Sequence, residues 1–210
     1  MNLEQLKWTI ATELPKIQGW CSLTKAEALI NAIVETKPKL LVEIGVFGGS
    51  SLIPQALALK DLGEGVIYGI DPWSTGAALE EMVSAAHKDW WSQVNLDDIL
   101  AGCRGHIDRL GLNEHVKLIR DKAENAASQF VDNSIDILHI DGNHSEELAY
   151  KDAMLYLPKV KSGGTIFFDD VWWTDGGDDP TTRKAILFLL GQCTRVGDLI
   201  GKDCMRLRKN

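Results

Sequence analysis

The stretch LVEIGVFGGSS, residues 41–51, decides the fold of this chain. A short apolar run stops at the acid Glu43, enters a glycine-rich turn and continues as a helical pattern over 52–60. Glycine tolerates a positive φ angle and lets a ligand approach the backbone closely. The free N–H groups at the start of the following helix face the same space. The pattern therefore predicts a strand, a turn and a helix around a cofactor site.

A second apolar run, 66–70, ends in Asp71, where an acid can accept hydrogen bonds from ribose hydroxyls. The two signals together predict a nucleoside-containing cofactor. The glycines of the 45–49 turn lack the spacing of the dinucleotide fingerprint, and the chain has no phosphate-cradling loop motif. Glu43 would repel phosphates but suits the ammonium and sulfonium of S-adenosylmethionine. The alternative is an ordinary strand–turn–helix connection without a ligand.

Composition narrows the class of protein. The chain has 210 residues and a formal net charge of −8, without a basic tract, which argues against nucleic-acid or anionic-membrane partners. No apolar stretch approaches the ~20 residues that span a bilayer, and the N-terminus lacks the features of a secretory signal. We expect a cytoplasmic protein with free cysteines, a disulfide pair being the alternative. A single domain, 1–210, would comprise an N-terminal helical cap, 1–37, and a catalytic core, 38–210.

Apolar runs alternate with helical patterns along the chain. We expect strands at 40–45, 66–70, 116–119, 135–140 and 164–168. We expect helices at 2–14, 24–36, 50–60, 77–111, 122–130, 146–157 and 181–190. Two further runs, 193–200 and 203–207, predict an antiparallel hairpin. The predicted fold class is α/β: a Rossmann-like, mainly parallel seven-stranded sheet that ends in an antiparallel hairpin and is preceded by N-terminal helices.

Two local features refine this prediction. Thr24 is expected to cap the second helix, with Glu27 completing a capping box. Pro38 should end that helix, because the residue before proline leaves the helical region. The Trp90-Trp91 pair belongs either to the core or to a lid over a substrate pocket.

Two later strands also end in acids, Asp141 after one and Asp169-Asp170 after the other. The carboxyl ends of parallel strands share one edge of a sheet, so these acids should meet Glu43 and Asp71 on a common rim. Their mutual repulsion favours a hard divalent cation such as Mg²⁺ or Mn²⁺ among them. The alternative is that each acid caps a helix or a turn.

Two histidines lie close to this rim. His144 follows Asp141 by three residues and is a candidate general base, since an unperturbed histidine titrates near pH ~6.5. The alternative for His144 is an ordinary surface or core histidine. His139 lies within a buried strand and is interpreted as structural.

Four motifs in order, VEIGVFGGSS, GIDPW, HIDGNHS and GGTIFFDD, resemble those of the small metal-dependent class I O-methyltransferases. Catechol O-methyltransferase is one relative, and the macrocin-type sugar O-methyltransferases and the cephalosporin-hydroxylase-like group look closer. The resemblance covers about 38–173. It implies the class I methyltransferase fold and S-adenosylmethionine as methyl donor.

By this resemblance, the turn after the first strand would surround the methionine part of the donor. The residues implied there are Glu43, Gly45, Phe47, Gly48, Ser50 and Ser51. Asp71 would hold the ribose, with Trp73 nearby. The residues implied at the adenine edge are Asp121, Lys122 and Ala123.

The resemblance also implies the reactive end of the site. Asp141, a cofactor contact as well, would bind the metal together with Asp169 and Asp170. His144 stands where the catechol enzymes carry a lysine base, and Asp170 stands where they carry asparagine. These departures leave open the identity of the base and the preferred metal.

The sequence thus predicts an S-adenosylmethionine-dependent, divalent-metal-dependent O-methyltransferase. Its acceptor would be a small-molecule hydroxyl of a sugar, diol or catechol, because a metal binds two vicinal oxygens and lowers the pKa of one. His144 and Asp141 would be catalytic. The alternatives are a methyltransferase-like metal enzyme of different chemistry, a nicotinamide-dependent oxidoreductase and a noncatalytic binding protein. Trp8 and Trp20 suggest an exposed apolar surface and hence a homodimer.

Overall fold

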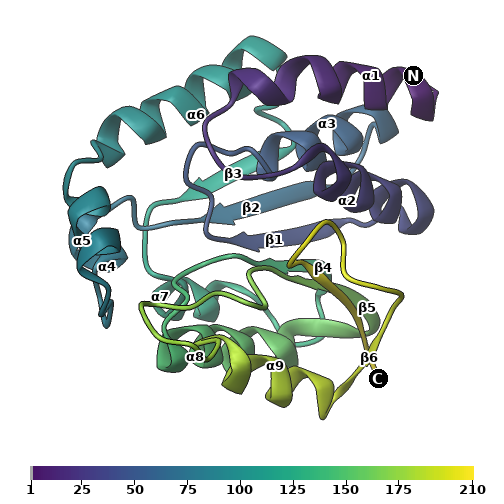
Figure 1. Cartoon of the computed structure of the whole chain (residues 1–210). Coiled ribbons are helices and arrows are strands. Elements are labelled where there is room, and N and C mark those ends of the chain that lie inside the picture. The colour runs from purple at the N-terminus through teal and green to yellow at the C-terminus, as the bar shows by residue number, and fades with distance from the viewer. Residues whose placement is uncertain (1) are drawn as a thin grey trace.

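The computed structural model describes residues 2–210, in which the strands form one seven-stranded sheet (Figure 1). The strands are β1 (Leu40–Ile44), β2 (Val66–Ile70), β3 (Val116–Ile119), β4 (Ile135–Ile140), β5 (Val160–Phe168), β6 (Cys193–Arg195) and β7 (Met205–Lys209). Their spatial order is β3-β2-β1-β4-β5-β7-β6. The strands β1 to β5 are parallel, whereas β7 runs antiparallel to both β5 and β6. The predicted α/β class and the antiparallel end of the sheet are confirmed.

Helices cover both faces of the sheet (Figure 1). One face carries α1 (Leu3–Glu13), α2 (Leu23–Thr36), α3 (Leu52–Leu62) and α6 (Leu96–Leu110). The other face carries α7 (Ala123–Ala126), α8 (Glu146–Tyr156) and α9 (Arg183–Leu190). Two short helices, α4 (Thr75–Ala78) and α5 (Ala85–Ser92), lie beyond the carboxyl ends of β1 and β2. Single 3₁₀ turns follow α1, α7 and α8, at Leu14–Lys16, Ala127–Gln129 and Leu157–Lys159.

The core consists of two apolar clusters, one on each face of the sheet. Successive side chains of a strand point to opposite faces, so Leu41 joins the cluster under α2 and α3, and Val42 joins the cluster under α8 and α9. The same alternation sends Glu43 toward the α2 side. In the sheet register, Glu43 lies beside His139, and His139 lies beside Phe167. Two polar side chains therefore enter the cluster on the α2 side.

Two local predictions need correction. The pattern over 77–111 forms three helices, α4, α5 and α6, because Asn95 caps a new helix by accepting a hydrogen bond from the backbone N–H of Asp98 (3.4 Å). The N-cap of α2 is Ser22 rather than Thr24: the Ser22 hydroxyl accepts from the backbone N–H of Lys25 (3.1 Å). The second helix begins at Leu23, one residue earlier than predicted, and Lys25 lies in its first turn. It ends at Thr36, before Pro38, as predicted.

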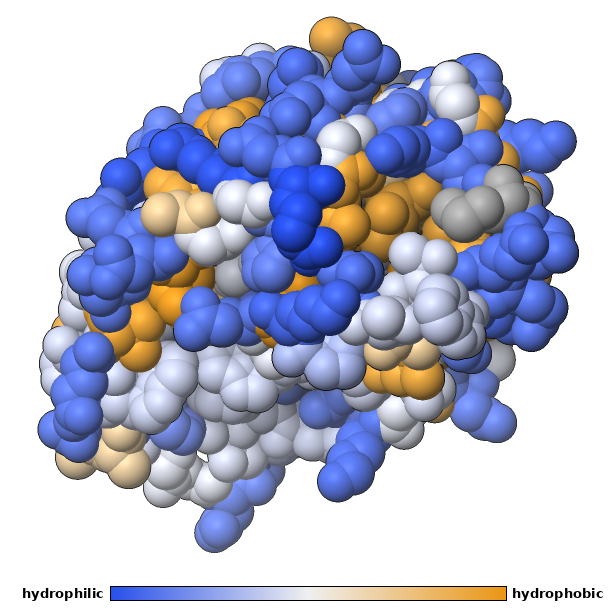
Figure 2. Space-filling view, turned by 90° about the horizontal axis from the view of Figure 1, so that it is seen from above, coloured by the Kyte–Doolittle hydropathy of each residue, from blue (hydrophilic) through white to orange (hydrophobic). Residues whose placement is uncertain are grey.

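The surface seen from the side of α1 and α6 is mostly hydrophilic, with hydrophobic residues in separate patches (Figure 2). Trp8 is 72% exposed on α1. The homodimer suggested by Trp8 and Trp20 stays a prediction. Among the described residues, no helix is long and apolar enough to cross a membrane.

Candidate functional site

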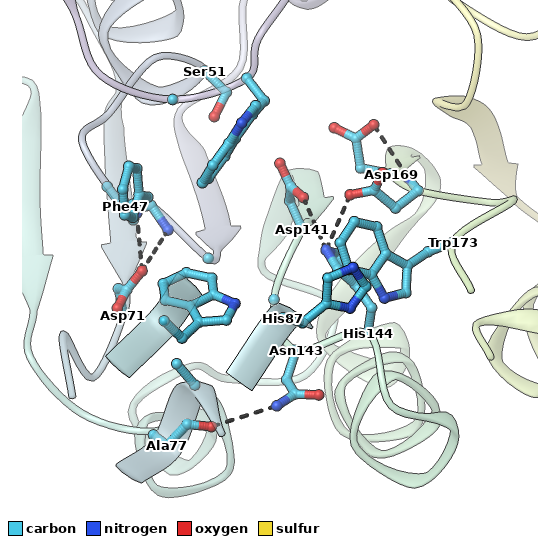
Figure 3. A pocket seen from close by; sticks show the side chains of 18 of the residues that line it. Phe47, Ser51, Asp71, Ala77, His87, Asp141, Asn143, His144, Asp169 and Trp173 are labelled. Carbon is cyan, nitrogen blue, oxygen red and sulfur yellow. Dashed lines mark hydrogen bonds and ion pairs between the residues drawn. The ribbon is translucent and has the colours of Figure 1, made fainter. Parts of the chain in front are cut away.

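A cavity of about 500 Å³ lies at the carboxyl ends of β1, β2, β4 and β5, where the sequence places its rim of acids (Figure 3). Its walls come from the loops after these strands, from the segment before α2 and from α4 and α5. Of the predicted site residues, it is lined by Gly45, Phe47, Ser50, Ser51, Asp71, Asp141, His144, Asp169 and Asp170. The structure therefore brings together residues from all four motifs.

A smaller cavity of about 90 Å³ adjoins the first. Both are lined by Gly45, Pro72, Ala77 and Asn143, so they meet along one seam. The amide of Asn143 donates to the backbone carbonyl of Glu80 (3.1 Å), which ties the segment after α4 to the seam. The smaller cavity is also lined by the predicted residues Lys122 and Ala123.

Asp71 holds the glycine-rich turn in place. Its Oδ2 accepts hydrogen bonds from the backbone N–H groups of Val46 (3.0 Å) and Phe47 (2.9 Å), and its Oδ1 accepts from the N–H of Trp73 (2.7 Å). Burial raises the pKa of Asp71, against the effect of these three donors. The Trp73 indole is buried and donates to the carbonyl of Phe47 (2.9 Å). Trp73 thus supports the turn from behind and does not line either cavity.

Replacing Asp71 with alanine should lower the free energy of unfolding by about 2 kcal/mol, because hydrogen bonds to a charged group are lost and backbone donors are left without acceptors. Urea unfolding of the variant would measure this loss. Asp132→Ala is the matched control, since Asp132 is an exposed acid in a turn far from the cavity. Equal stability of both variants would contradict the structural role of Asp71.

Glu43 is fully buried beneath the turn and does not line the cavity. Its carboxylate accepts from the Ser51 hydroxyl (2.9 Å) and from the Gln55 amide (2.5 Å), and lies 3.1 Å from His139 Nδ1. The other ring nitrogen, Nε2, lies 3.3 Å from Asp169 Oδ2. Burial disfavours a charged imidazole here, but hydrogen bonding to Asp169 and Glu43 outweighs it and raises the pKa of His139 to about 10. His139 is therefore a buried imidazolium that bridges two acids.

Lys25 reaches the same acids from α2. Its ammonium donates to Asp169 Oδ2 and lies 3.7 Å from Asp141 Oδ2. Burial opposes this charge, but Asp141 and Asp169 outweigh burial and raise the pKa of Lys25. Burial alone would raise the pKa of Asp169, but hydrogen bonding by His139 and the charge of Lys25 lower it. The sequence analysis missed Lys25. This lysine lines the cavity, and its positive charge reduces the repulsion between the carboxylates of Asp141 and Asp169.

His144 is paired with the outer acid of the rim. Its Nε2 lies 3.0 Å from Asp170 Oδ2 and 4.0 Å from Asp141 Oδ1. Burial disfavours a charged ring, but the hydrogen bond and charge of Asp170 outweigh it and raise the pKa of His144. Burial and the charge of Asp169 raise the pKa of Asp141 to about 7.

The three acids predicted to bind a metal divide between two groups. Asp141 and Asp169 lie with His139 in an inner group, and Asp141 lies with His144 and Asp170 in an outer group. The inner group does not fit a divalent cation, because the Lys25 ammonium bonds to Asp169 and His139 Nε2 lies 3.3 Å from the same carboxylate oxygen. The predicted set of Asp141, Asp169 and Asp170 is thus divided between the two groups, and a metal bound by all three acids stays a prediction.

Aromatic side chains complete the cavity, among them the Trp90-Trp91 pair, for which the sequence left the core and a lid as alternatives. Trp20 packs against Phe47 and Trp90, with ring centroids 4.9 and 5.4 Å apart. Trp173 stacks between the rings of His144 (5.1 Å) and His87 (4.9 Å). Both members of the Trp90-Trp91 pair line the cavity, and Trp90 is 44% exposed at its mouth. Only the aromatic character of these residues marked them in the sequence.

Besides Glu43 and Trp73, the predicted residues Gly48 and Asp121 line neither cavity, whereas Lys122 lines the smaller one. Gly48 does not line the cavity, because its Cα faces the backbone of Gln18. Asp121 Oδ1 accepts from the backbone N–H of Lys122 (2.7 Å) and from the Asn125 amide (2.7 Å), so it shapes the loop after β3. The Lys122 ammonium pairs with Glu80 (2.5 Å) across the smaller cavity.

Comparison with known proteins shows the family of the chain. The sequence model of a methyltransferase domain family matches residues 42–171. The chain belongs to this methyltransferase family. It is also 34% identical over 131 residues to the uncharacterized protein R132 of Acanthamoeba polyphaga mimivirus, covering 61% of this chain. The chain spans about half (50%) of the length of that curated relative.

Solved methyltransferase structures share the fold of this chain at low sequence identity. The S-adenosylhomocysteine-bound methyltransferase PaMTH1 of Podospora anserina has a TM-score of 0.66 at 16% identity, over 99% of this chain and 87% of its own. The Bacillus cereus O-methyltransferase in complex with S-adenosylhomocysteine has a TM-score of 0.60 at 18% identity, over 99% and 90%. TomG of Streptomyces achromogenes, an O-methyltransferase of tomaymycin synthesis in complex with S-adenosylmethionine, has a TM-score of 0.64 at 16% identity, over 99% and 88%. At these identities the likeness establishes the Rossmann-like methyltransferase fold.

Proposed function

We propose that this methyltransferase is an S-adenosylmethionine-dependent O-methyltransferase that acts on the hydroxyl of a small molecule. One observation carries the proposal: the glycine-rich turn held by Asp71 and the His144–Asp170 pair face each other across one cavity. A cofactor cradle and a base on opposite walls are what methyl transfer to a hydroxyl requires. The O-methyltransferases of the same fold support this assignment.

The two adjoining cavities suit the two ends of the donor. The methionine part would lie at Gly45, Phe47 and Ser50-Ser51 in the larger cavity, with Asp71 beside the ribose. The adenine would enter the smaller cavity, toward Lys122 and Ala123. The donor would then pass through the seam at Ala77, where the two cavities meet.

The chemistry follows from the pairing of His144. When Nε2–H donates to Asp170, the neutral ring keeps its lone pair on Nδ1, which can accept the proton of an acceptor hydroxyl. The oxygen attacks the methyl carbon in line, the carbon–sulfur bond breaks, and its electron pair turns the sulfonium into a neutral thioether. The proton stays on His144 until it leaves to solvent. The protein contributes mainly alignment of the two reactants and control of charge.

A divalent ion was predicted to hold the acceptor, yet the donor set of the inner group contains an ammonium and an imidazolium. Cationic groups do not ligate a metal, so this mechanism contains no step through the ion. We propose the same acceptor class as the sequence predicted, a hydroxyl of a sugar, diol or catechol-like molecule.

Calorimetric titration with S-adenosylhomocysteine tests the proposed function. The wild-type chain should bind it, whereas NAD should give no heat. Ala77→Phe should weaken binding at least tenfold, because the larger side chain blocks the seam between the cavities. Ala101→Phe is the matched control, since Ala101 lies exposed on α6, and it should bind like the wild type. Absence of binding by the wild type, or binding of NAD in its place, would refute the proposal.

A further inference from the structure

We infer that the Lys25 ammonium is the resident cation of the acidic rim and takes the place of a divalent ion between Asp141 and Asp169, so that methyl transfer in this protein needs no metal. The inference rests on the proposed function and goes beyond it, because it assigns Lys25 a part in acceptor binding.

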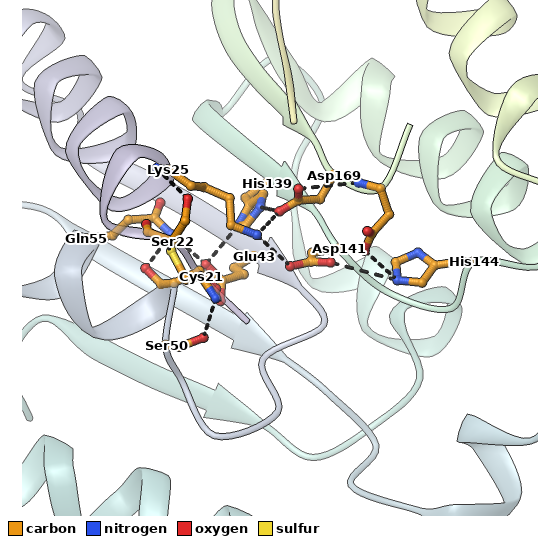
Figure 4. A network of polar contacts seen from close by, with 12 residues as sticks. Cys21, Ser22, Lys25, Glu43, Ser50, Gln55, His139, Asp141, His144 and Asp169 are labelled. Carbon is orange, nitrogen blue, oxygen red and sulfur yellow. Dashed lines mark hydrogen bonds and ion pairs between the residues drawn. The ribbon is translucent and has the colours of Figure 1, made fainter. Parts of the chain in front are cut away.

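The geometry places the lysine between the two strand-end acids (Figure 4). Its Nζ donates to Asp169 Oδ2 and lies 3.7 Å from Asp141 Oδ2, which come from the ends of β5 and β4. Asp169 and Asp141 are also the two acids of the inner group of potential metal ligands. The Lys25 side chain is only 11% exposed, so it is committed to this position rather than solvated at the surface.

The segment that carries Lys25 is docked firmly on the glycine-rich turn. The backbone N–H of Cys21 donates to the Ser50 hydroxyl (3.2 Å), and Ser22 caps α2 through the N–H of Lys25. A Cβ on Gly48 would lie 2.3 Å from the carbonyl oxygen of Gln18, so this glycine permits the close approach of the two segments. The contacts of Gln18 and Cys21 with the glycine-rich turn, together with the Ser22 cap, therefore fix the start of α2 and with it the backbone of Lys25.

The charges around Asp169 leave little attraction for a second cation. Asp169 accepts from the Lys25 ammonium, and its Oδ2 also lies 3.3 Å from His139 Nε2, while the other ring nitrogen of His139 lies 3.1 Å from Glu43. A divalent ion between Asp141 and Asp169 would meet the ammonium at close range and would have to expel it. Two like charges in a partly buried site repel strongly because the surroundings screen them weakly.

The ammonium can also do part of what an ion does for the acceptor. It carries three N–H donors, and it lines the cavity that also contains His144. A donor left over from Asp169 and Asp141 can bind the acceptor oxygen and favour its deprotonated form through charge. Because Asp169 and Asp141 face the ammonium as well, one N–H donor remains for one acceptor oxygen, whereas chelation of an acceptor requires two oxygens. An acceptor with one hydroxyl therefore satisfies this site, and a vicinal diol or catechol is not required.

Titration with Mn²⁺, followed by the electron paramagnetic resonance signal of the free ion, tests the inference without any need for the acceptor. The wild-type chain should leave the signal unchanged. Lys25→Met keeps the apolar stem but removes the charge, so it should bind one Mn²⁺ at least tenfold more tightly than the wild type. Lys25→Arg keeps a cation and should not gain the ion. The matched control, Lys7→Met on α1, should behave like the wild type, because Lys7 pairs only loosely with Glu4 (3.7 Å).

Several results would overturn the inference. Stoichiometric binding of Mn²⁺ by the wild type would overturn the inference. If His144→Ala then lost this Mn²⁺ binding, the ion would be assigned to the outer group of Asp141, His144 and Asp170. Equal Mn²⁺ affinity of Lys25→Met and the wild type would also overturn the inference. If Lys25→Met does not fold, the titrations of the wild type and of Lys25→Arg decide the matter.

Calorimetry with S-adenosylhomocysteine on the same samples separates this inference from the proposed function. A wild-type chain that binds S-adenosylhomocysteine but also Mn²⁺ refutes only the role of Lys25. A chain that binds neither refutes the proposed function. Once an acceptor is known, turnover should survive exhaustive chelation, and a tenfold loss on chelation would refute the inference.

Discussion

Replacing His144 with alanine should lower kcat by roughly 100- to 10,000-fold, the range that a positioned general base contributes. The affinity for S-adenosylhomocysteine should stay near that of the wild type, because His144 lies on the wall opposite the glycine-rich turn (Figure 3). Methyl transfer from labelled donor would measure the rate, and calorimetry would measure the affinity. His106→Ala, a half-buried histidine on α6 that does not line the cavity, is the matched control. A variant with wild-type turnover would show that another group takes the proton.

The pH profile gives this prediction a second readout. A base must be neutral to accept a proton, so kcat should rise with pH and level off above the pKa of His144. That pKa is raised by the hydrogen bond and charge of Asp170 over the opposing effect of burial, so the inflection should lie above the usual value of about 6.5. Asp170→Asn removes the charge and should shift the inflection to lower pH. An inflection that does not move would separate His144 from the proton transfer.

The sequence predicted the sheet and the rim well because both depend on local patterns. Apolar runs that end in acids mark parallel strands, and the carboxyl ends of such strands meet at one edge. Asp71, Asp141, Asp169 and Asp170 accordingly line one cavity. The alternation of side chains along a strand could have taken the argument further. Glu43 and His139 share the α2 side of the sheet, so an inward histidine beside an inward acid was a readable signal of a buried polar network.

The cation of the rim could not be predicted in the same way. Lys25 lies 144 residues before Asp169 in the chain, and no local motif of the second helix marks this lysine as inward. Its direction depends on how α2 packs on the sheet, where Lys25 lies on the same buried face as Leu29 and Ile33. Repulsion among acids correctly indicates that a cation is needed. It does not distinguish a metal ion from an ammonium supplied by a distant helix.

The reason for the glycines in the glycine-rich turn could not be predicted from the sequence alone either. The sequence explained its glycines by the approach of a ligand, yet the closest neighbours of Gly45 and Gly48 are segments of the chain itself. Gly45 has a φ of +83°, and a Cβ there would lie 1.8 Å from the carbonyl oxygen of Asp141. The first motif is therefore partly a packing requirement between the ends of β1 and β4. A glycine that admits a ligand and a glycine that admits another segment of the chain cannot be told apart in a sequence, since both positions need a residue without a side chain.

Gly45→Ala should accordingly lower the free energy of unfolding by about 3–5 kcal/mol, the combined scale of a strained positive φ and an overpacked contact. Gly63→Ala separates the two causes. Gly63 has a φ of +73° at the end of α3 with open space around it, so alanine there meets only the backbone penalty, about 1–2 kcal/mol. Urea unfolding of both variants, compared at equal m values, measures the difference. Equal losses would mean that the contact with Asp141 relaxes at no cost.

The same substitution should also disturb the site. The backbone N–H of Asp141 donates to the carbonyl of Ile44 (2.8 Å), which anchors the end of β4 beside Gly45. A Cβ that pushes the Asp141 carbonyl away would move its carboxylate from Lys25 and His144 together. Gly45→Ala should therefore lose turnover even where enough of it folds, whereas Gly63→Ala should keep turnover at its reduced stability. Full activity in a folded Gly45→Ala protein would show that the backbone position of Asp141 does not govern the reactive end of the cavity.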